Sequence, residues 1–111
     1  MHAMQDTGLI VEDQGAVRTL QLHRPAVHNA FDASLAAALT DALRQAGQAP
    51  QIRVVVLTGA GTAFSAGADL NLMRAMASAS DAENAADALA LAQLMRTLDE
   101  LPKPTIARVN G

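Results

Sequence analysis

The chain has 111 residues, enough for one modest domain. Half of the residues are hydrophobic, only Phe31 and Phe64 are aromatic, and the formal net charge is −3. The acidic balance argues against a nucleic-acid partner, because nucleic-acid-binding surfaces are usually basic. The chain lacks the cysteines needed for a disulfide or a cysteine metal site, and no apolar run approaches the ~18 residues that cross a bilayer. We therefore expect a soluble, cytoplasmic protein with no nucleic-acid or membrane partner.

The first predicted elements are two strands that form an antiparallel hairpin. Residues 9–12 and 16–22 are rich in aliphatic and β-branched side chains and flank a glycine-containing turn. In the second strand Val17, Leu20 and Leu22 alternate imperfectly with polar residues. This pattern predicts one face toward the core and one face toward water.

A helix and a buried strand are predicted next. The spacing predicts a helix over 32–48, with Asp32 as its N-cap. The apolar stripe of this helix consists of Leu35, Leu39, Leu43 and Ala46. The run 52–57 is almost continuously apolar, which is typical of a strand buried on both faces.

The second half of the chain is predicted to hold two helices and a strand. A short helix over 69–76 precedes a longer one, which begins at the capping-box motif Ser80-Asp-Ala-Glu83 and ends near residue 101. The apolar stripe of the longer helix consists of Leu91, Leu94, Met95, Leu98 and Leu101. A strand over 105–109 follows two prolines. The alternation of strand and helix predicts an α/β fold with parallel strands layered by helices.

The last predicted strand has no helix after it, so its apolar side chains would stay uncovered. We therefore expect residues 1–111 to be the N-terminal portion of a longer single domain that continues past Gly111. The alternative is a chain whose missing face is supplied by a partner.

The loop after the buried strand is the main candidate for a functional site. Ser65-Ala-Gly-Ala68 carries almost no side-chain atoms, so the loop can bring its own amide groups against a ligand. Asp69 can cap the helix predicted after it, which puts the preceding amides near the positive end of a helix dipole. Such amides can hold a developing oxyanion without a titratable residue.

The residues alone leave two other interpretations of this loop open. Gly59-Ala-Gly61 after a strand matches the start of a dinucleotide-binding motif, although Phe64 stands at the third glycine position. Small residues are also required simply for close packing at a strand-to-helix turn. Asn29, in an earlier loop, is expected to make local backbone hydrogen bonds that shape its turn.

Three segments with specific spacing follow one another along the chain. They are Arg24-Pro-Ala-Val-His-Asn-Ala30, Phe64-Ser-Ala-Gly-Ala-Asp-Leu70 and Pro102-Lys-Pro-Thr-Ile-Ala-Arg-Val-Asn-Gly111. In type and order they resemble segments of the enoyl-CoA hydratase/isomerase (crotonase) family. The resemblance implies the N-terminal part of a crotonase-like ββα spiral, with a mixed twisted sheet and flanking helices. It also implies an acyl-CoA thioester as substrate, no cofactor or metal beyond coenzyme A itself, and trimers or hexamers of the full-length protein.

The resemblance also assigns roles to individual residues. The backbone N–H of Ala68 would be one of two donors to the thioester carbonyl oxygen. The expected substrate-binding residues are Val27, His28, Ala30, Ala66, Gly67, Asp69 and Leu70. The first three would lie beside the adenine or pantetheine end of CoA, and the others would line the acyl-CoA site.

The expected activity is addition of water to a 2-enoyl-CoA through an enolate intermediate. In the family, the second oxyanion donor and the two glutamates that activate water would lie beyond Gly111, so we expect these 111 residues alone to be inactive. The stretch 66–73 looks closest to members that act on branched or carboxylated enoyl-CoA, such as methylglutaconyl-CoA hydratases. The alternatives are a non-catalytic CoA-binding or assembly fragment and a nucleotide-binding α/β domain.

Overall fold

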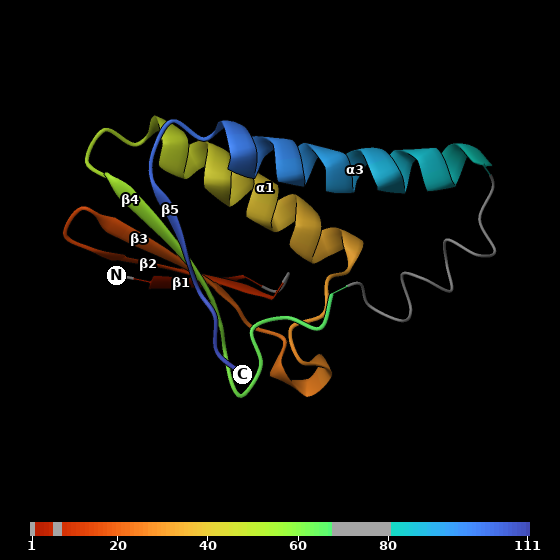
Figure 1. The fold of residues 1–111 in the computed structure, drawn as a ribbon, viewed down its shortest axis with the longest axis horizontal. Helices are drawn as coiled ribbons and strands as arrows, with labels where there is room; N and C mark the ends of the chain where they lie inside the picture. The colour runs from red at the N-terminus through yellow and green to blue at the C-terminus, as the bar shows by residue number, and fades with distance from the viewer. Residues whose placement is uncertain (1, 6–7, 68–80) are drawn as a thin grey trace.

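The computed structural model describes residues 2–5, 8–67 and 81–111. These residues form a five-stranded sheet with two α-helices on one face (Figure 1). The strands are β1 (His2–Gln5), β2 (Leu9–Gln14), β3 (Val17–Leu22), β4 (Val54–Gly59) and β5 (Thr105–Arg108). The helices are the 3-10 helix η1 (Pro25–Val27) and the α-helices α1 (Ala33–Gln48) and α3 (Asp81–Glu100). The expected fold class, α/β with a mixed sheet and flanking helices, is confirmed.

The strands lie side by side in chain order, from β1 at one edge to β5 at the other. β1, β2 and β3 are antiparallel neighbours, whereas β3, β4 and β5 run parallel, with α1 and α3 as their crossover helices. Two successive crossovers of the usual right hand, stepping the same way across a sheet, place both helices on the same face. Figure 1 shows α1 and α3 together on that face.

The structure adds an edge strand that the sequence pattern does not predict. β1 pairs with β2 in a register that runs from His2 opposite Glu12 to Gln5 opposite Leu9. An edge strand of four residues is held by backbone hydrogen bonds to one neighbour, so it does not need the alternation that identifies a half-buried strand.

Helix α1 supplies most of the core, as its spacing predicts. The Asp32 carboxylate accepts a hydrogen bond from the Leu35 N–H at 2.8 Å, which confirms the predicted N-cap. All members of the predicted stripe are at most 2% exposed: Leu35, Leu39, Leu43 and Ala46. They join one cluster with buried side chains from the sheet and from α3: Leu9, Leu20, Leu22, Val55 and Leu94.

The predicted core face of β3 is correct for Leu20 and Leu22 but wrong for Val17. Leu20 and Leu22 are fully buried. Val17 is an odd number of residues from Leu20, so the alternation of a strand puts it on the opposite face. Arg18 shares the core-facing side of β3 and makes two hydrogen bonds to Asp13 on β2, at 2.7 and 2.9 Å. The Asp13 carboxylate therefore gives the Arg18 guanidinium a charged hydrogen-bond partner at the end of the core.

The prediction of a strand over 52–57 buried on both faces is also wrong. β4 begins two residues later, at Val54, and Ile52 is buried before the strand starts. Within β4, Val55 is buried while Val54 and Val56 are only half-buried. The reason is that the described helices cover one face of the sheet, and Val54 and Val56 alternate onto the other face.

Helix α3 confirms the longer of the two predicted helices. Leu94 is 2% exposed, and the other leucines of the predicted stripe pack against the core: Leu91, Leu98 and Leu101. Met95 is wrongly included in that stripe, because it is 57% exposed. The predicted helix over 69–76 and the capping residue Ser80 lie outside the described residues.

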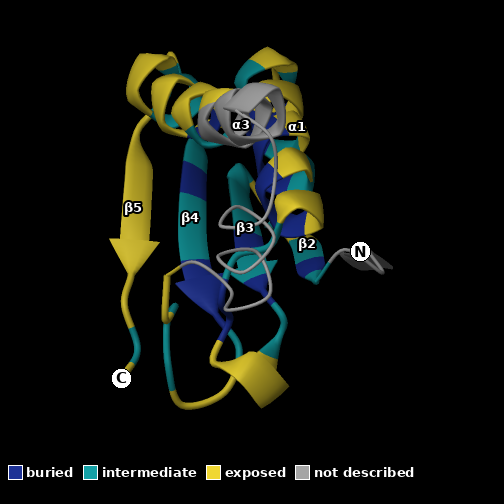
Figure 2. Cartoon of the chain, turned by 90° about the vertical axis from the view of Figure 1, so that its right-hand side faces the viewer, coloured by how far each residue is buried: buried dark blue, intermediate teal, exposed yellow. Residues whose placement is uncertain are grey.

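Strand β5 is exposed along its whole length (Figure 2). Ile106 is 53% exposed, and Val109 just after the strand is 66% exposed. No described helix is both long enough and apolar enough to cross a bilayer.

Candidate functional site

The three segments singled out from the sequence meet at one edge of the sheet. The first follows β3, the second follows β4, and the third contains β5 and the residues after it. Because β3, β4 and β5 are parallel, their carboxyl ends share an edge, which is where ligands bind in open α/β sheets. Figure 1 shows η1, the loop after β4 and the C-terminal end at the same end of the molecule.

Asn29 joins the first segment to the loop that leads from β4 into the second segment. Its side chain is completely buried, and its backbone has a positive φ of 57°. The side-chain oxygen accepts a hydrogen bond from the Arg24 N–H at 2.7 Å. The side-chain nitrogen donates to the carbonyl oxygens of Ala60 and Ala63, both at 2.8 Å. One amide side chain therefore connects two loops more than 30 residues apart in sequence.

Backbone hydrogen bonds extend this connection toward the candidate site residues. The Ala66 N–H donates to the His28 carbonyl oxygen at 2.9 Å, and the Phe31 N–H donates to the Gly67 carbonyl oxygen at 2.6 Å. Gly67 has a φ of 88°, and among the described residues other than its chain neighbours none lies within 4 Å of the position of a Cβ there. The structure thus brings His28, Ala66 and Gly67 together.

Ser65 adds a side-chain link between the same two loops. Its hydroxyl donates to the Asn29 carbonyl oxygen at 3.0 Å and accepts from the Gly67 N–H at 3.1 Å. The Ser65 hydroxyl therefore links the backbone of the buried Asn29 to that of the exposed Gly67.

The candidate substrate-binding residues differ in how accessible they are. Val27 is 40% exposed, and His28, Ala66 and Gly67 are exposed as well. Ala30 is only 6% exposed, and its carbonyl oxygen accepts a hydrogen bond from the Arg24 guanidinium. The other candidates, Ala68, Asp69 and Leu70, lie outside the described residues.

Gly59 allows the loop after β4 to fold back tightly. A Cβ at this position would lie 2.4 Å from the Phe64 carbonyl oxygen and 2.9 Å from both the Ala63 carbonyl oxygen and the Asn29 side-chain nitrogen. Backbone oxygens cannot move aside without breaking the loop, so the site requires a residue without a side chain.

Asn110 joins the third segment to the same loop. Its side-chain oxygen accepts from the Gly59 N–H at 3.3 Å, and its side-chain nitrogen donates to the Gly61 carbonyl oxygen at 2.9 Å. Nearby, the Thr58 hydroxyl donates to the Arg108 carbonyl oxygen at 2.9 Å. Sequence reasoning did not identify Asn110 or Ser65, and the available signal was a polar residue at the carboxyl end of a predicted strand.

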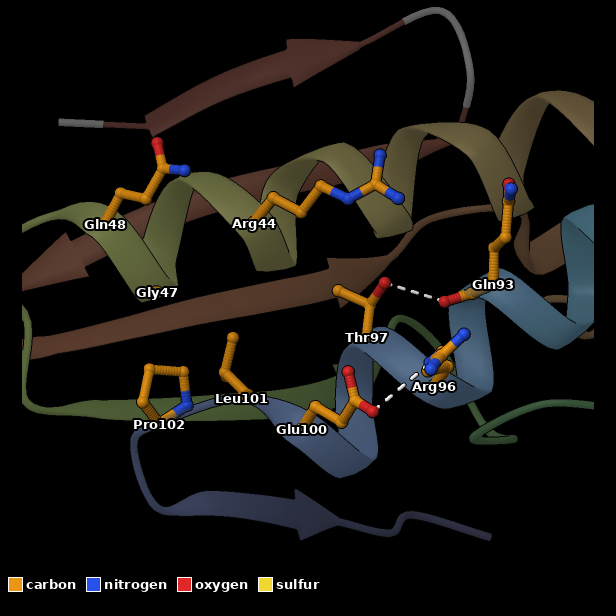
Figure 3. Close-up of a pocket in the computed structure, with 9 residues that line it drawn as sticks. All are labelled: Arg44, Gly47, Gln48, Gln93, Arg96, Thr97, Glu100, Leu101 and Pro102. Atoms are coloured by element: carbon orange, nitrogen blue, oxygen red, sulfur yellow. Dashed lines mark hydrogen bonds and ion pairs between the residues drawn. The ribbon is translucent and has the colours of Figure 1, made fainter.

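A separate groove lies between α1 and α3, toward the amino ends of β4 and β5 and opposite to the candidate site (Figure 3). It has a volume of about 460 Å³ and is lined by Arg44, Gly47, Gln48, Gln93, Arg96, Thr97, Glu100, Leu101 and Pro102. These residues belong to the ends of α1 and α3 that lead into β4 and β5, away from the carboxyl ends of the strands. Arg96 is paired with Glu100 at 3.2 Å. The groove is therefore not part of the candidate site.

Comparison with known proteins agrees with the fold and with the three segments. The profile of the family described as enoyl-CoA hydratase/isomerase matches residues 12–111. A 2,3-dehydroadipyl-CoA hydratase of Escherichia coli is 39% identical over 103 residues, covering 93% of this chain and 38% of that protein. A 1,2-epoxyphenylacetyl-CoA isomerase of the same organism is 39% identical over 101 residues, covering 86% of this chain and 37% of that protein.

The solved structures give the same result. The crystal structure of an enoyl-CoA hydratase from Shewanella pealeana superposes with a TM-score of 0.91 at 37% identity, covering 97% of this chain and 44% of that one. The chain spans 36–41% of the length of the curated relatives that it matches. The profile match over residues 12–111 places the chain in the enoyl-CoA hydratase/isomerase family.

Proposed function

We propose that the protein containing this chain binds an acyl-CoA thioester and adds water to the double bond of a 2-enoyl-CoA. The observation that carries the proposal is that three family segments, distant in sequence, meet at the carboxyl ends of the parallel strands. Asn29 and Asn110 both hold residues 59–63, which lead into the second segment, and Ser65 and Ala66 of that segment bond to the first. Family membership supplies the class of substrate.

The proposed chemistry is stabilisation of an enolate by backbone amides. Polarising the thioester carbonyl draws electron density from the double bond, so that the oxygen of water bonds to the β-carbon while that water gives up one proton to a general base. The α-carbon then takes a proton as the enolate collapses. The Ala68 N–H is the proposed first donor to the thioester oxygen, and one such donor is typically worth about a hundredfold or more in rate.

The proposed donor can be tested with a residue that has no backbone N–H. In the product of the complete reading frame, Ala68→Pro removes the N–H, and we expect kcat for crotonyl-CoA to fall by about a hundredfold or more. Ala68→Gly keeps the N–H and is the matched control, so it should keep most of the activity. The measurement is the loss of the enoyl-thioester absorbance. Equal kcat values in the two variants would contradict the proposed role of this amide.

We also propose that residues 1–111 alone bind CoA weakly or not at all and do not turn over substrate. The reason is that the resemblance assigns the second donor and the water-activating glutamates to positions past Gly111. Titration calorimetry with CoA and with NAD separates this proposal from the nucleotide-binding alternative. Binding of NAD without binding of CoA, by this chain or by the complete product, would contradict the acyl-CoA assignment.

The substrate and the assembly remain to be measured. The names of the relatives include a hydratase and an isomerase acting on different acyl-CoA compounds. A panel of linear, branched and carboxylated enoyl-CoA thioesters tests the predicted preference for branched or carboxylated substrates such as methylglutaconyl-CoA. Light scattering on the complete product tests the predicted trimer or hexamer.

A further inference from the structure

We propose that Asn29 is a positioning residue of the acyl-CoA site, an inference that rests on the proposed function. Its buried side chain fixes the loop 60–67, and through that loop it fixes the peptide group that carries the proposed oxyanion donor. Asn29 itself need not touch the substrate.

The side-chain amide of Asn29 makes hydrogen bonds to both loops. Its amide makes three hydrogen bonds of 2.7–2.8 Å, to the Arg24 N–H and to the Ala60 and Ala63 carbonyl oxygens. The side chain is fully buried, so water cannot replace these bonds when the side chain is removed. An aliphatic residue would leave one buried donor and two buried acceptors without partners.

The same residue also reaches the end of the loop. The Asn29 carbonyl oxygen accepts from the Ser65 hydroxyl, which in turn accepts from the Gly67 N–H. On either side of Asn29, His28 accepts from Ala66 and Phe31 donates to Gly67. The loop is therefore held at its beginning by the Asn29 side chain and at its end by the backbone next to it.

A last contact involves the peptide group after Gly67. A trans peptide group is planar, and its C=O and N–H point in opposite directions. The hydrogen bond from the Phe31 N–H to the Gly67 carbonyl oxygen, at 2.6 Å, restrains the carbonyl group of Gly67, and the next N–H in the chain follows it directly. That next N–H is the proposed donor of Ala68, which itself lies outside the described residues. A change in the position of segment 28–31 would move the Gly67 carbonyl group that precedes the proposed donor, and an oxyanion donor loses its effect when it is misaligned.

The decisive variant is Asn29→Gly in the product of the complete reading frame. Asn29 has a positive φ of 57°, which glycine adopts without strain, so this variant removes the three side-chain hydrogen bonds and adds no backbone strain to the folded state. We expect kcat for an enoyl-CoA to fall by at least about tenfold, because the donor is misplaced. Hydrogen exchange in peptides covering 60–67 should become faster.

The matched control is Leu43→Ala, a fully buried core position in the half of α1 that leads toward β4. It should lower the Tm as much as Asn29→Gly does, or more, while leaving kcat and the exchange of 60–67 close to wild type. An unchanged kcat in folded Asn29→Gly would overturn the proposal. An equal loss of kcat in Leu43→Ala would do the same, because the effect would then be one of general stability.

Ser65 provides the test if Asn29→Gly does not fold. Ser65→Ala removes the link between Asn29 and Gly67, whereas Ser65→Thr keeps the hydroxyl. We expect Ser65→Ala to lower kcat and Ser65→Thr to retain it, and equal values would overturn the proposal. Wild-type protein without turnover would instead refute the proposed function. In that case the exchange of 60–67 still decides whether Asn29 holds the loop, and unchanged exchange overturns that part as well.

Discussion

At the scale of single residues, the site depends on positions where geometry permits few alternatives. Gly59 lies so close to the carbonyl oxygens of Ala63 and Phe64 that no side chain fits. Asn29 combines a left-handed backbone, which asparagine tolerates better than most residues, with an amide that both donates and accepts hydrogen bonds. No other standard residue except glutamine offers that amide, and glutamine is one methylene longer. The fit explains why this position holds the two loops.

The ion pair between Asp13 and Arg18 predicts a pH dependence of stability. The hydrogen bonds from Arg18 hold the pKa of the Asp13 carboxyl below its ordinary value of 3.8. A lowered pKa in the folded state means that the unfolded chain binds more protons in acid. The stabilisation is therefore present above the ordinary carboxyl pKa and is lost as the pH falls through and below it. The Asp13 side chain is 36% exposed, so solvent screening keeps the effect modest.

Urea unfolding of Asp13→Asn at several pH values tests this prediction. Between about pH 5 and about pH 2, the free energy of unfolding should decline less in the variant than in the wild type. Arg18→Met removes the partner instead of the carboxylate and should flatten the pH dependence in the same way. Parallel pH profiles for wild type and Asp13→Asn would show that the pair contributes nothing.

At the scale of elements, α3 shows how narrow the buried stripe of a helix can be. Leu94 and Met95 are adjacent in sequence, yet Leu94 is 2% exposed and Met95 is 57% exposed. Successive side chains of a helix point about 100° apart, so one neighbour enters the core while the other faces away. Helical spacing alone admits both residues, because Met95 is four residues from Leu91. Packing against α1 selects only Leu94.

Alanine substitutions at these two positions should therefore differ strongly. Leu94→Ala is expected to lower the free energy of unfolding by about 2–5 kcal/mol, the usual cost of truncating a buried leucine. Met95→Ala, as the matched control in the same helical turn, should change it by less than about 0.5 kcal/mol. Urea unfolding of both variants measures the difference. Similar losses in the two would mean that α3 packs on a different face.

At the scale of the whole molecule, the sheet places three distant segments at the carboxyl ends of its parallel strands. The loop after β4 lies between the other two: Asn29 holds Ala60 and Ala63, and Asn110 holds Gly59 and Gly61. Both asparagine side chains therefore position the same loop. The two side chains act on one structural unit although they are 81 positions apart (110 minus 29) in the sequence.

This arrangement predicts that the two asparagines are energetically coupled. In a double-mutant cycle of Asn29→Gly and Asn110→Ala, the coupling free energy should be at least about 0.5 kcal/mol, since both remove contacts to residues 59–63. A control cycle of Asn110→Ala with Leu43→Ala, which share no partner, should be additive within about 0.5 kcal/mol. The measurement is equilibrium unfolding. Additivity in the asparagine cycle would indicate that the loop is held by each contact independently.

The sequence by itself determined the elements whose signals are local. The N-cap Asp32 and the leucine spacing after it specify α1, and the glycine-containing turn specifies the hairpin of β2 and β3. The three segments indicated the family, and the profile match over residues 12–111 confirms it. These signals succeed because capping, turn geometry and helical spacing depend on residues within a few positions of one another.

Only the tertiary structure decided what depends on neighbours far away in the chain. Asn29 was expected to make local hydrogen bonds, and it makes one with Arg24. Its other two hydrogen bonds reach Ala60 and Ala63, which follow it by 31 and 34 positions in the chain. The burial of Val56 likewise depends on which face of the sheet the helices cover, and the edge strand β1 depends on a partner strand beside it. Such contacts form only when loop closure and packing bring the segments together, and no short window of sequence contains both partners.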